Sequence, residues 1–254
     1  MKNKKLLIII TIIFSTILCS CLYFKFFSHS PKAVGVLSNT AVPENKMLPK
    51  KVGDISLDQK TYSDYYIQKV TMYMNSDDKQ GQIVFLGDSL TDIGQWNELL
   101  NNPCILNRGI SGDTTSGVLN RLSEVIKLKP RKIFIMIGIN DIGKGLSTNE
   151  ITKNYSKILG RINKDLPNTG IYVESVLPIN KDLFKTSTSE KQITDLNISL
   201  NKLCKSLSVQ YIDLYHLFTL PNQNKLSYKY TVSGLHINGD GYRVWRDALK
   251  PYLQ

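Results

Sequence analysis

The chain has 254 residues, of which 42% are hydrophobic and 21% are charged. This length accommodates one α/β domain with a hydrophobic core and an extension, and the composition excludes collagen-like and disordered chains. The net charge is +11, but eight lysines and only three acids lie in residues 1–58, so much of the excess belongs to the N-terminal part. The absence of basic runs interleaved with aromatic residues argues against nucleic acid as a partner.

Residues 1–25 are typical of a membrane anchor or signal segment. Lysines occupy three of the first five positions, and the 19 residues from Leu6 to Phe24 are almost entirely apolar. A bilayer span needs about 20 such residues, and the lysines favour a cytoplasmic N-terminus. Two interpretations stay open: an uncleaved, single-pass signal anchor, and a cleaved signal that yields a secreted protein or a lipoprotein modified at Cys21. Both place the domain outside the cytoplasm.

Residues 26–58 lack periodicity and contain several prolines, which predicts a flexible linker. The domain is therefore expected to span residues 59–254. It begins with tyrosines at helical spacing between Gln59 and Tyr73, which predict a helix that packs on the domain.

Short apolar segments then alternate with helical patterns. Such a rhythm predicts a parallel sheet covered by helices on both faces, an α/β fold with three layers. Sites in this architecture form at the carboxyl ends of the strands. The predicted strands cover five segments, 82–86, 104–107, 132–137, 170–176 and 209–213, and the predicted helices cover 89–100, 115–128, 148–166, 189–207 and 239–252.

Four polar motifs follow these strands or precede the last helix. Ser89 comes directly after the first strand, where a helix N-terminus favours developing negative charge. Gly112 follows the second strand and lets a backbone N–H approach a ligand, and Asn140 follows the third and offers an amide donor. His236 precedes the last helix, and its imidazole can accept the Ser89 proton. Taken singly, each motif is also typical of a helix cap or a turn.

Together, the motifs resemble the SGNH, or GDSL, hydrolase family over about residues 82–250, in particular the branch of platelet-activating-factor acetylhydrolase-like and acetyl-ester-cleaving enzymes. The matching stretches are Gly87-Asp-Ser-Leu90, Ile110-Ser-Gly-Asp-Thr114, Gly138-Ile-Asn-Asp141 and Leu235-His-Ile-Asn238. The resemblance implies a flavodoxin-like fold and a serine esterase of small acyl esters that uses no metal or organic cofactor.

The resemblance also implies a role for each residue. Ser89 attacks the ester carbonyl, and His236 acts first as general base and then as general acid. The oxyanion is held by the backbone N–H groups of Ser89 and Gly112 and by the side-chain amide of Asn140.

One position departs from the family pattern. The family has Asp three residues before the histidine, whereas this chain has Ser233, which brings no charge to stabilise an imidazolium. Three explanations stay open: Ser233 or a backbone carbonyl orients His236 in a working dyad, Asp213 approaches instead, or catalysis is weak and the domain chiefly binds. His216, just after the last strand, is a rival for the role of base.

Three functions follow from these expectations. The first is an extracytoplasmic esterase that removes acetyl or similar groups from a surface glycan or another ester. The alternatives are an O-acyltransferase of surface glycans and a tethered glycan-binding module with little or no activity. A nucleotide-binding flavodoxin-like protein is disfavoured, because the loops after the strands lack a Gly-rich phosphate-binding pattern.

Overall fold

The computed structural model describes residues 49–77, 80–220 and 223–253. The predicted membrane anchor over residues 1–25 lies outside them. Within these three ranges, no helix combines the length and the hydropathy that a bilayer span requires.

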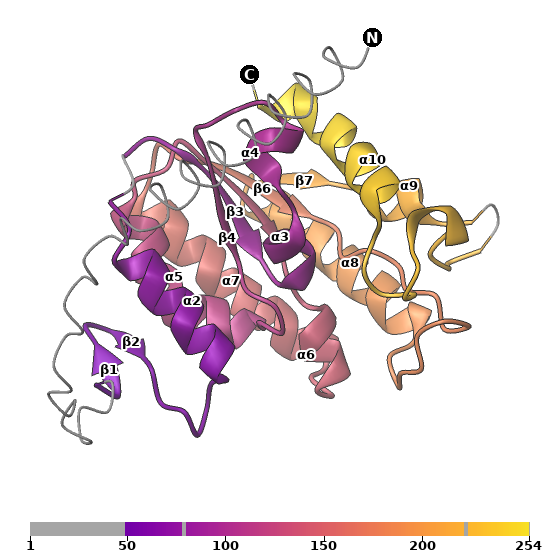
Figure 1. The fold of residues 1–254 in the computed structure, drawn as a ribbon, viewed down its shortest axis with the longest axis horizontal. Coiled ribbons are helices and arrows are strands. Elements are labelled where there is room, and N and C mark those ends of the chain that lie inside the picture. Colours follow the sequence, from indigo (N-terminus) through magenta and orange to yellow (C-terminus); the bar gives the residue numbers. More distant parts are fainter. Residues whose placement is uncertain (1–48, 78–79, 221–222, 254) are drawn as a thin grey trace, which may run out of the picture. The chain divides into compact units, whose positions relative to one another are not determined.

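A sheet of five parallel strands forms the centre of the domain (Figure 1), as predicted. The strand order is β4-β3-β5-β6-β7, so the chain moves outward in opposite directions from β3. Ligands in such sheets bind where the strand order reverses, outside the carboxyl ends, and Ser89 follows β3 at this point. The strands are β3 (Ile83–Gly87), β4 (Ile105–Gly109), β5 (Lys132–Met136), β6 (Gly170–Glu174) and β7 (Gln210–Ile212).

Helices cover both faces of this sheet (Figure 1), which confirms the three-layer sandwich. Val84 and Leu86 of β3 belong to a core shared with α5, α7 and α8, whereas Ile83 and Phe85 point to the other face and share a core with α4 and α10. This alternation follows from the two-residue period of a strand. The covering helices are α5 (Thr115–Lys127), α7 (Thr148–Asp165), α8 (Glu190–Ser206), α4 (Trp96–Leu99) and α10 (Gly239–Leu249).

Short helices follow several of the strands. The single helix predicted over residues 89–100 is wrong: the chain forms α3 and α4 there, separated by Gly94 in an extended conformation (φ −66°, ψ 127°). The break lets the Trp96 ring fold back, where its Nε1 donates to the carbonyl of Thr91 at 2.8 Å. The short helices are α3 (Ser89–Ile93), α6 (Ile139–Gly143), α9 (Tyr215–Phe218) and the 3₁₀ turns η1 (Tyr228–Tyr230) and η2 (Lys250–Tyr252).

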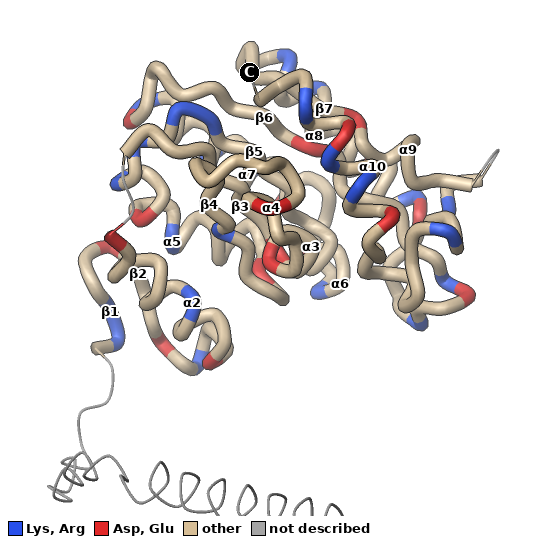
Figure 2. The backbone as a smooth tube through the Cα atoms, turned by 45° about the horizontal axis from the view of Figure 1, so that its top comes forward, with Lys and Arg blue, Asp and Glu red and all other residues tan. Residues whose placement is uncertain are grey.

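The ordered domain begins before residue 59. A hairpin of β1 (Lys51–Val52) and β2 (Ile55–Ser56) precedes α2 (Asp64–Met74). Ile55 and Leu57 are buried in a small core with α2, so the last part of the expected linker over 26–58 packs on the domain through its apolar side chains. Basic and acidic positions are interspersed along the described helices and loops (Figure 2).

Candidate active site

Ser89 is the first residue of α3, directly beyond the carboxyl end of β3. The side chain of Asp88 caps this helix by accepting from the Leu90 N–H at 3.1 Å. A Cβ at Gly87 would collide with the Thr91 hydroxyl and the Met136 carbonyl, so the turn into α3 requires glycine there. The sequence therefore forms a tight strand-to-helix turn that presents the Ser89 hydroxyl at the edge of the sheet.

His236 lies against Ser89, with 2.9 Å between its Nε2 and the serine Oγ. The loop that carries it is closed by the Thr231 hydroxyl, which donates to the His236 carbonyl at 2.7 Å and accepts from the Gly234 N–H at 2.8 Å. Burial lowers the pKa of His236 below its usual value of 6.5. The imidazole is consequently neutral at pH 7, which is the state that can accept the serine proton.

Gly112 and Asn140 reach the same edge of the sheet from the ends of β4 and β5. Gly112 has a positive φ of 80°, and the space where a Cβ would stand is open, so a ligand can approach its backbone. Asn140 donates one N–H of its side chain to the carbonyl of Asp113 at 2.8 Å. An amide has two such hydrogens, so the second remains for a substrate oxygen. The structure thus brings Ser89 and His236 into contact and joins Asn140 to the residue after Gly112, with both pairs at the carboxyl ends of neighbouring strands.

The chain matches the model of the GDSL-like lipase/acylhydrolase family over residues 85–244. The chain belongs to this family. It is accordingly a carboxylic ester hydrolase, as its sequence led us to expect.

Relatives of this acylhydrolase include the alpha2 subunit of platelet-activating factor acetylhydrolase IB from Rattus norvegicus. That protein is 29% identical over 202 residues, which cover 77% of this chain and 84% of the relative. A solved structure from Streptococcus pneumonia, named for a platelet activating factor, has a TM-score of 0.70 at 29% identity and covers 75% of this chain and 93% of that one. An acetylxylan esterase from Geobacillus stearothermophilus shares the fold at 19% identity, with a TM-score of 0.55 over 67% of this chain and 93% of that one.

Ser233 occupies the position three residues before His236, where the family pattern has the aspartate of the catalytic triad. The Ser233 hydroxyl accepts from the backbone N–H of His236 at 3.1 Å, so it shapes the loop, and it makes no hydrogen bond to the imidazole. Asp213 lies 2.7 Å from Nδ1 of His216, and that exposed pair is separate from the Ser89 site. Within the described part of the chain, no carboxylate is hydrogen bonded to Nδ1 of His236.

A buried arginine supports residues 110–114, the loop that contains Gly112 (the glycine loop). Arg121 on α5 is fully buried and donates to the Asp113 carboxylate at 2.9 Å and to the carbonyls of Arg108 at 2.8 Å and Gly87 at 3.3 Å. These contacts join the residue after Gly112 to the end of the strand that carries the nucleophile. The sequence reasoning missed Arg121, because one charge in an amphipathic helix carries no signal that it is buried.

Asp92 forms a second support, which the sequence reasoning also missed. Its carboxylate accepts from the backbone N–H and the hydroxyl of Ser111 at 3.0 and 2.8 Å, and from Tyr65 and Lys69 of α2 at 2.7 Å each. Although burial acts to raise it, these hydrogen bonds lower the pKa of Asp92 below its usual value. The nucleophile helix α3, the glycine loop and α2 are therefore held together at one carboxylate.

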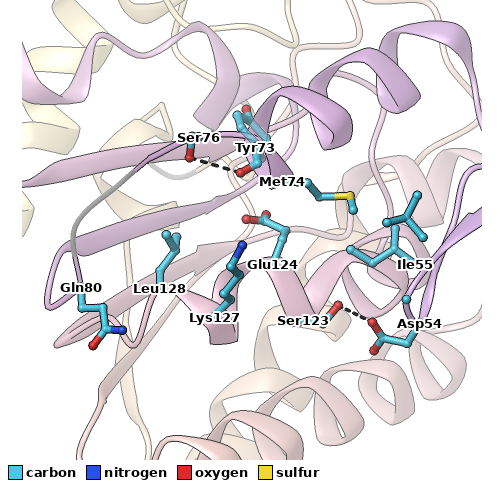
Figure 3. A pocket seen from close by; sticks show the side chains of 12 residues that line it. Asp54, Ile55, Tyr73, Met74, Ser76, Gln80, Ser123, Glu124, Lys127 and Leu128 are labelled. Carbon is cyan, nitrogen blue, oxygen red and sulfur yellow. Dashed lines mark hydrogen bonds between the residues drawn. The ribbon is translucent and has the colours of Figure 1, made fainter.

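Two hollows lie near these supports. One of 430 Å³ is lined by Gly112 and its neighbours in the chain and by Tyr62 and Lys144. Ser89, Asn140 and His236 are not among its lining residues. Another of 370 Å³ lies between the N-terminal hairpin, the end of α2 and α5, and Glu124 and Lys127 point toward it (Figure 3). None of the predicted site residues lines the second hollow, so we assign the chemistry to the Ser89 edge of the sheet.

Proposed function

We propose that this acylhydrolase is an extracytoplasmic serine esterase that removes small acyl groups, acetyl above all, from a glycan or another extracellular ester. The observation that carries the proposal is the 2.9 Å contact between Ser89 Oγ and His236 Nε2. Gly112 and Asn140 at the same edge supply hydrogen-bond donors where the carbonyl oxygen of a bound ester would lie. The acetyl specificity draws on the acetylhydrolase and acetylxylan esterase among the similar proteins.

The proposed reaction begins when Ser89 Oγ attacks the ester carbonyl and its proton passes to Nε2 of His236. The resulting oxyanion accepts hydrogen bonds from the N–H groups of Ser89 and Gly112 and from the free N–H of Asn140. His236 then protonates the alcohol as it leaves. Water, activated by the same imidazole, hydrolyses the acyl-serine and restores the enzyme.

In this scheme Ser89 and His236 act as a dyad. His236 acquires a positive charge during the reaction. None of the described residues makes a direct hydrogen bond to its Nδ1 that would compensate this charge. In a protease triad, replacing the acid lowers kcat by about 10⁴, so we expect modest turnover. The same observation favours a second candidate, a glycan-binding module with weak residual catalysis.

Serine-reactive labelling separates these candidates without knowledge of the substrate. The full chain in detergent is treated with a fluorophosphonate, alongside Ser89→Ala and His236→Ala. The esterase proposal expects wild-type labelling, no labelling of Ser89→Ala, strongly reduced labelling of His236→Ala, and release of acetate from p-nitrophenyl acetate. If wild type and Ser89→Ala are equally inert to the label and to a panel of esters, the esterase proposal fails. Transfer of acetyl to an added sugar would instead identify an acyltransferase.

The extracytoplasmic location is part of the proposal and rests on the apolar segment Leu6–Phe24 with its preceding lysines. We expect the full chain to fractionate with membranes and its domain to be digested by a protease added to intact spheroplasts. Protection from that protease would contradict this location. A change in membrane retention on Cys21→Ser would point to the lipoprotein alternative.

A further inference from the structure

The hollow lined by Gly112 borders the active site at this one residue. Its volume is 430 Å³, within the range of about 300–1,000 Å³ that is usual for ligand pockets. Because Gly112 lines it, a substrate whose carbonyl oxygen accepts from the Gly112 N–H would border this hollow. We propose that this hollow binds the alcohol part of the ester and that this alcohol is a saccharide with negative charge. The inference rests on the proposed esterase function.

The walls of the hollow supply hydroxyl donors. Ser63, Thr114 and Ser116 line it, and each hydroxyl oxygen accepts a hydrogen bond from an N–H group, at 3.2, 3.3 and 3.4 Å respectively. A hydroxyl that accepts still has its own proton to donate. The hollow therefore offers several donors to the oxygens of a polyhydroxylated ligand.

An aromatic wall accompanies these hydroxyls. The rings of Tyr62 and Tyr66 stack, with centroids 4.4 Å apart and planes 13° apart. Tyr66 is anchored, since its hydroxyl donates to the Gly117 carbonyl at 2.8 Å and accepts from Asn120 at 3.0 Å. The Tyr62 hydroxyl has no such partner among the residues that the structure describes. A saccharide packs its weakly positive C–H face on such a ring, whose face is electron-rich. The Tyr62 hydroxyl can in addition form a hydrogen bond with the saccharide.

Lys144 gives the hollow its charge preference. The lining contains two charged side chains, Lys144 and Asp113, and the Asp113 carboxylate is already paired with Arg121 at 2.9 Å. The exposed ammonium of Lys144 is thus the charge available to a ligand. It favours a saccharide that carries carboxylate or phosphate groups.

The test compares KM for three esters: p-nitrophenyl acetate, a neutral acetylated xylo-oligosaccharide and an acetylated oligogalacturonate. Tyr62→Ala is expected to raise KM for both saccharide esters about tenfold and to leave KM for p-nitrophenyl acetate within about twofold, as loss of ground-state binding does. Lys144→Ala is expected to raise KM for the oligogalacturonate alone. Met72→Ala, an exposed α2 side chain (66%), and Lys157→Ala, an exposed lysine on α7, are the matched controls and should change none of these values.

The outcomes separate this inference from the esterase proposal. If the wild type hydrolyses p-nitrophenyl acetate but Tyr62→Ala shifts KM equally for all three esters, the saccharide subsite is refuted and the esterase stands. The same holds if neither saccharide ester has a lower KM than p-nitrophenyl acetate. Equal effects of Lys144→Ala on the neutral and the charged saccharide refute the charge preference. If the wild type cleaves none of the three, the esterase proposal itself fails. Thermal unfolding of each variant shows whether a shift in KM reflects loss of fold.

Discussion

Ser233 determines how His236 is held. A serine hydroxyl that accepts from the backbone N–H of His236 at 3.1 Å fixes the loop, but no carboxylate of the described residues is hydrogen bonded to Nδ1 of the imidazole. Burial then dominates and lowers the pKa of His236. A general base whose pKa is lowered is more often deprotonated at neutral pH, although it is also a weaker base.

The pH profile should report this environment. Because His236 must be neutral to act, kcat/KM is expected to rise with pH through a midpoint below 6.5 and then to level off. In Ser233→Asp, a carboxylate near the ring stabilises the imidazolium and raises its pKa, so the midpoint should move up by about one unit and kcat should increase. Ser233→Asn, similar in size and uncharged, is the control. An unchanged midpoint in Ser233→Asp would show that a carboxylate at this position does not reach the ring.

Asn140 is expected to contribute through the transition state. We propose that its second N–H donates to the oxyanion, and removal of one such donor typically lowers kcat by about 10²–10³. Asn140→Ala should therefore lose activity by this factor with little change in KM. Asn154→Ala, which removes an amide that contacts the hydroxyls of Thr115 and Ser116, provides a comparison for general disturbance of α5. Equal losses in the two variants would argue against an oxyanion role.

At the scale of elements, the site depends on how α3, α2 and the glycine loop are joined. Asp92 makes this junction, and its side chain is only 7% exposed. Breaking a buried ion pair by removing one partner costs about 3–5 kcal/mol, because the other charge stays uncompensated. The cost should be smaller here, because the side chain of Lys69 is 21% exposed and water can still solvate its charge. We therefore expect Asp92→Asn to lower the free energy of unfolding by roughly 2 kcal/mol and to reduce kcat, since the loop bearing Gly112 loosens.

Urea denaturation measures this effect. Asp195→Asn is the matched control, because Asp195 pairs with Lys191 on the surface, where both side chains are well exposed and the pair contributes about 0.5 kcal/mol or less. Comparable losses in the two variants would mean that Asp92 acts as an ordinary surface charge.

The elements also show where sequence reasoning succeeds. The five strands and the long helices were predictable because apolar runs alternate with amphipathic ones. The candidate site residues were named because three motifs follow strands that end at one edge of the sheet and because all four motifs together resemble the family. The helix break at Gly94 could not be predicted, since it depends on how the Trp96 ring packs. The structural roles of Arg121 and Asp92 could not be predicted either, because they come from partners far away in the sequence. The hairpin at residues 51–56 was missed because two-residue strands have no readable period.

For the molecule as a whole, Glu174 links the sheet to its outer helix layer. It ends β6, is fully buried and accepts from the Trp245 indole of α10 at 3.3 Å. Burial raises the pKa of Glu174 to about 8 from its ordinary 4.5. The folded protein thus holds this proton more tightly than the unfolded chain, so the stabilisation is complete below pH 4.5 and is lost as the pH rises to about 8.

Glu174→Gln removes this titration and keeps the size of the side chain. The difference in unfolding free energy, Glu174→Gln minus wild type, should grow between pH 5 and 8 and then stay constant. Urea denaturation at pH 5, 7 and 9 measures it, and the other buried carboxyls cancel in the difference. A difference that is the same at all three pH values would show that Glu174 is ionised throughout.

The tyrosine wall has a consequence for how such enzymes diversify. Tyr62 and Tyr66 precede residue 85, where the family match starts, whereas Ser89, Gly112, Asn140 and His236 all lie within it. A substrate preference built from the preceding segment can drift, or be exchanged for another, while the reacting groups stay as they are. Grafting residues 49–74 onto a relative would then transfer the aromatic part of the saccharide preference, but neither the charge preference of Lys144 nor the chemistry.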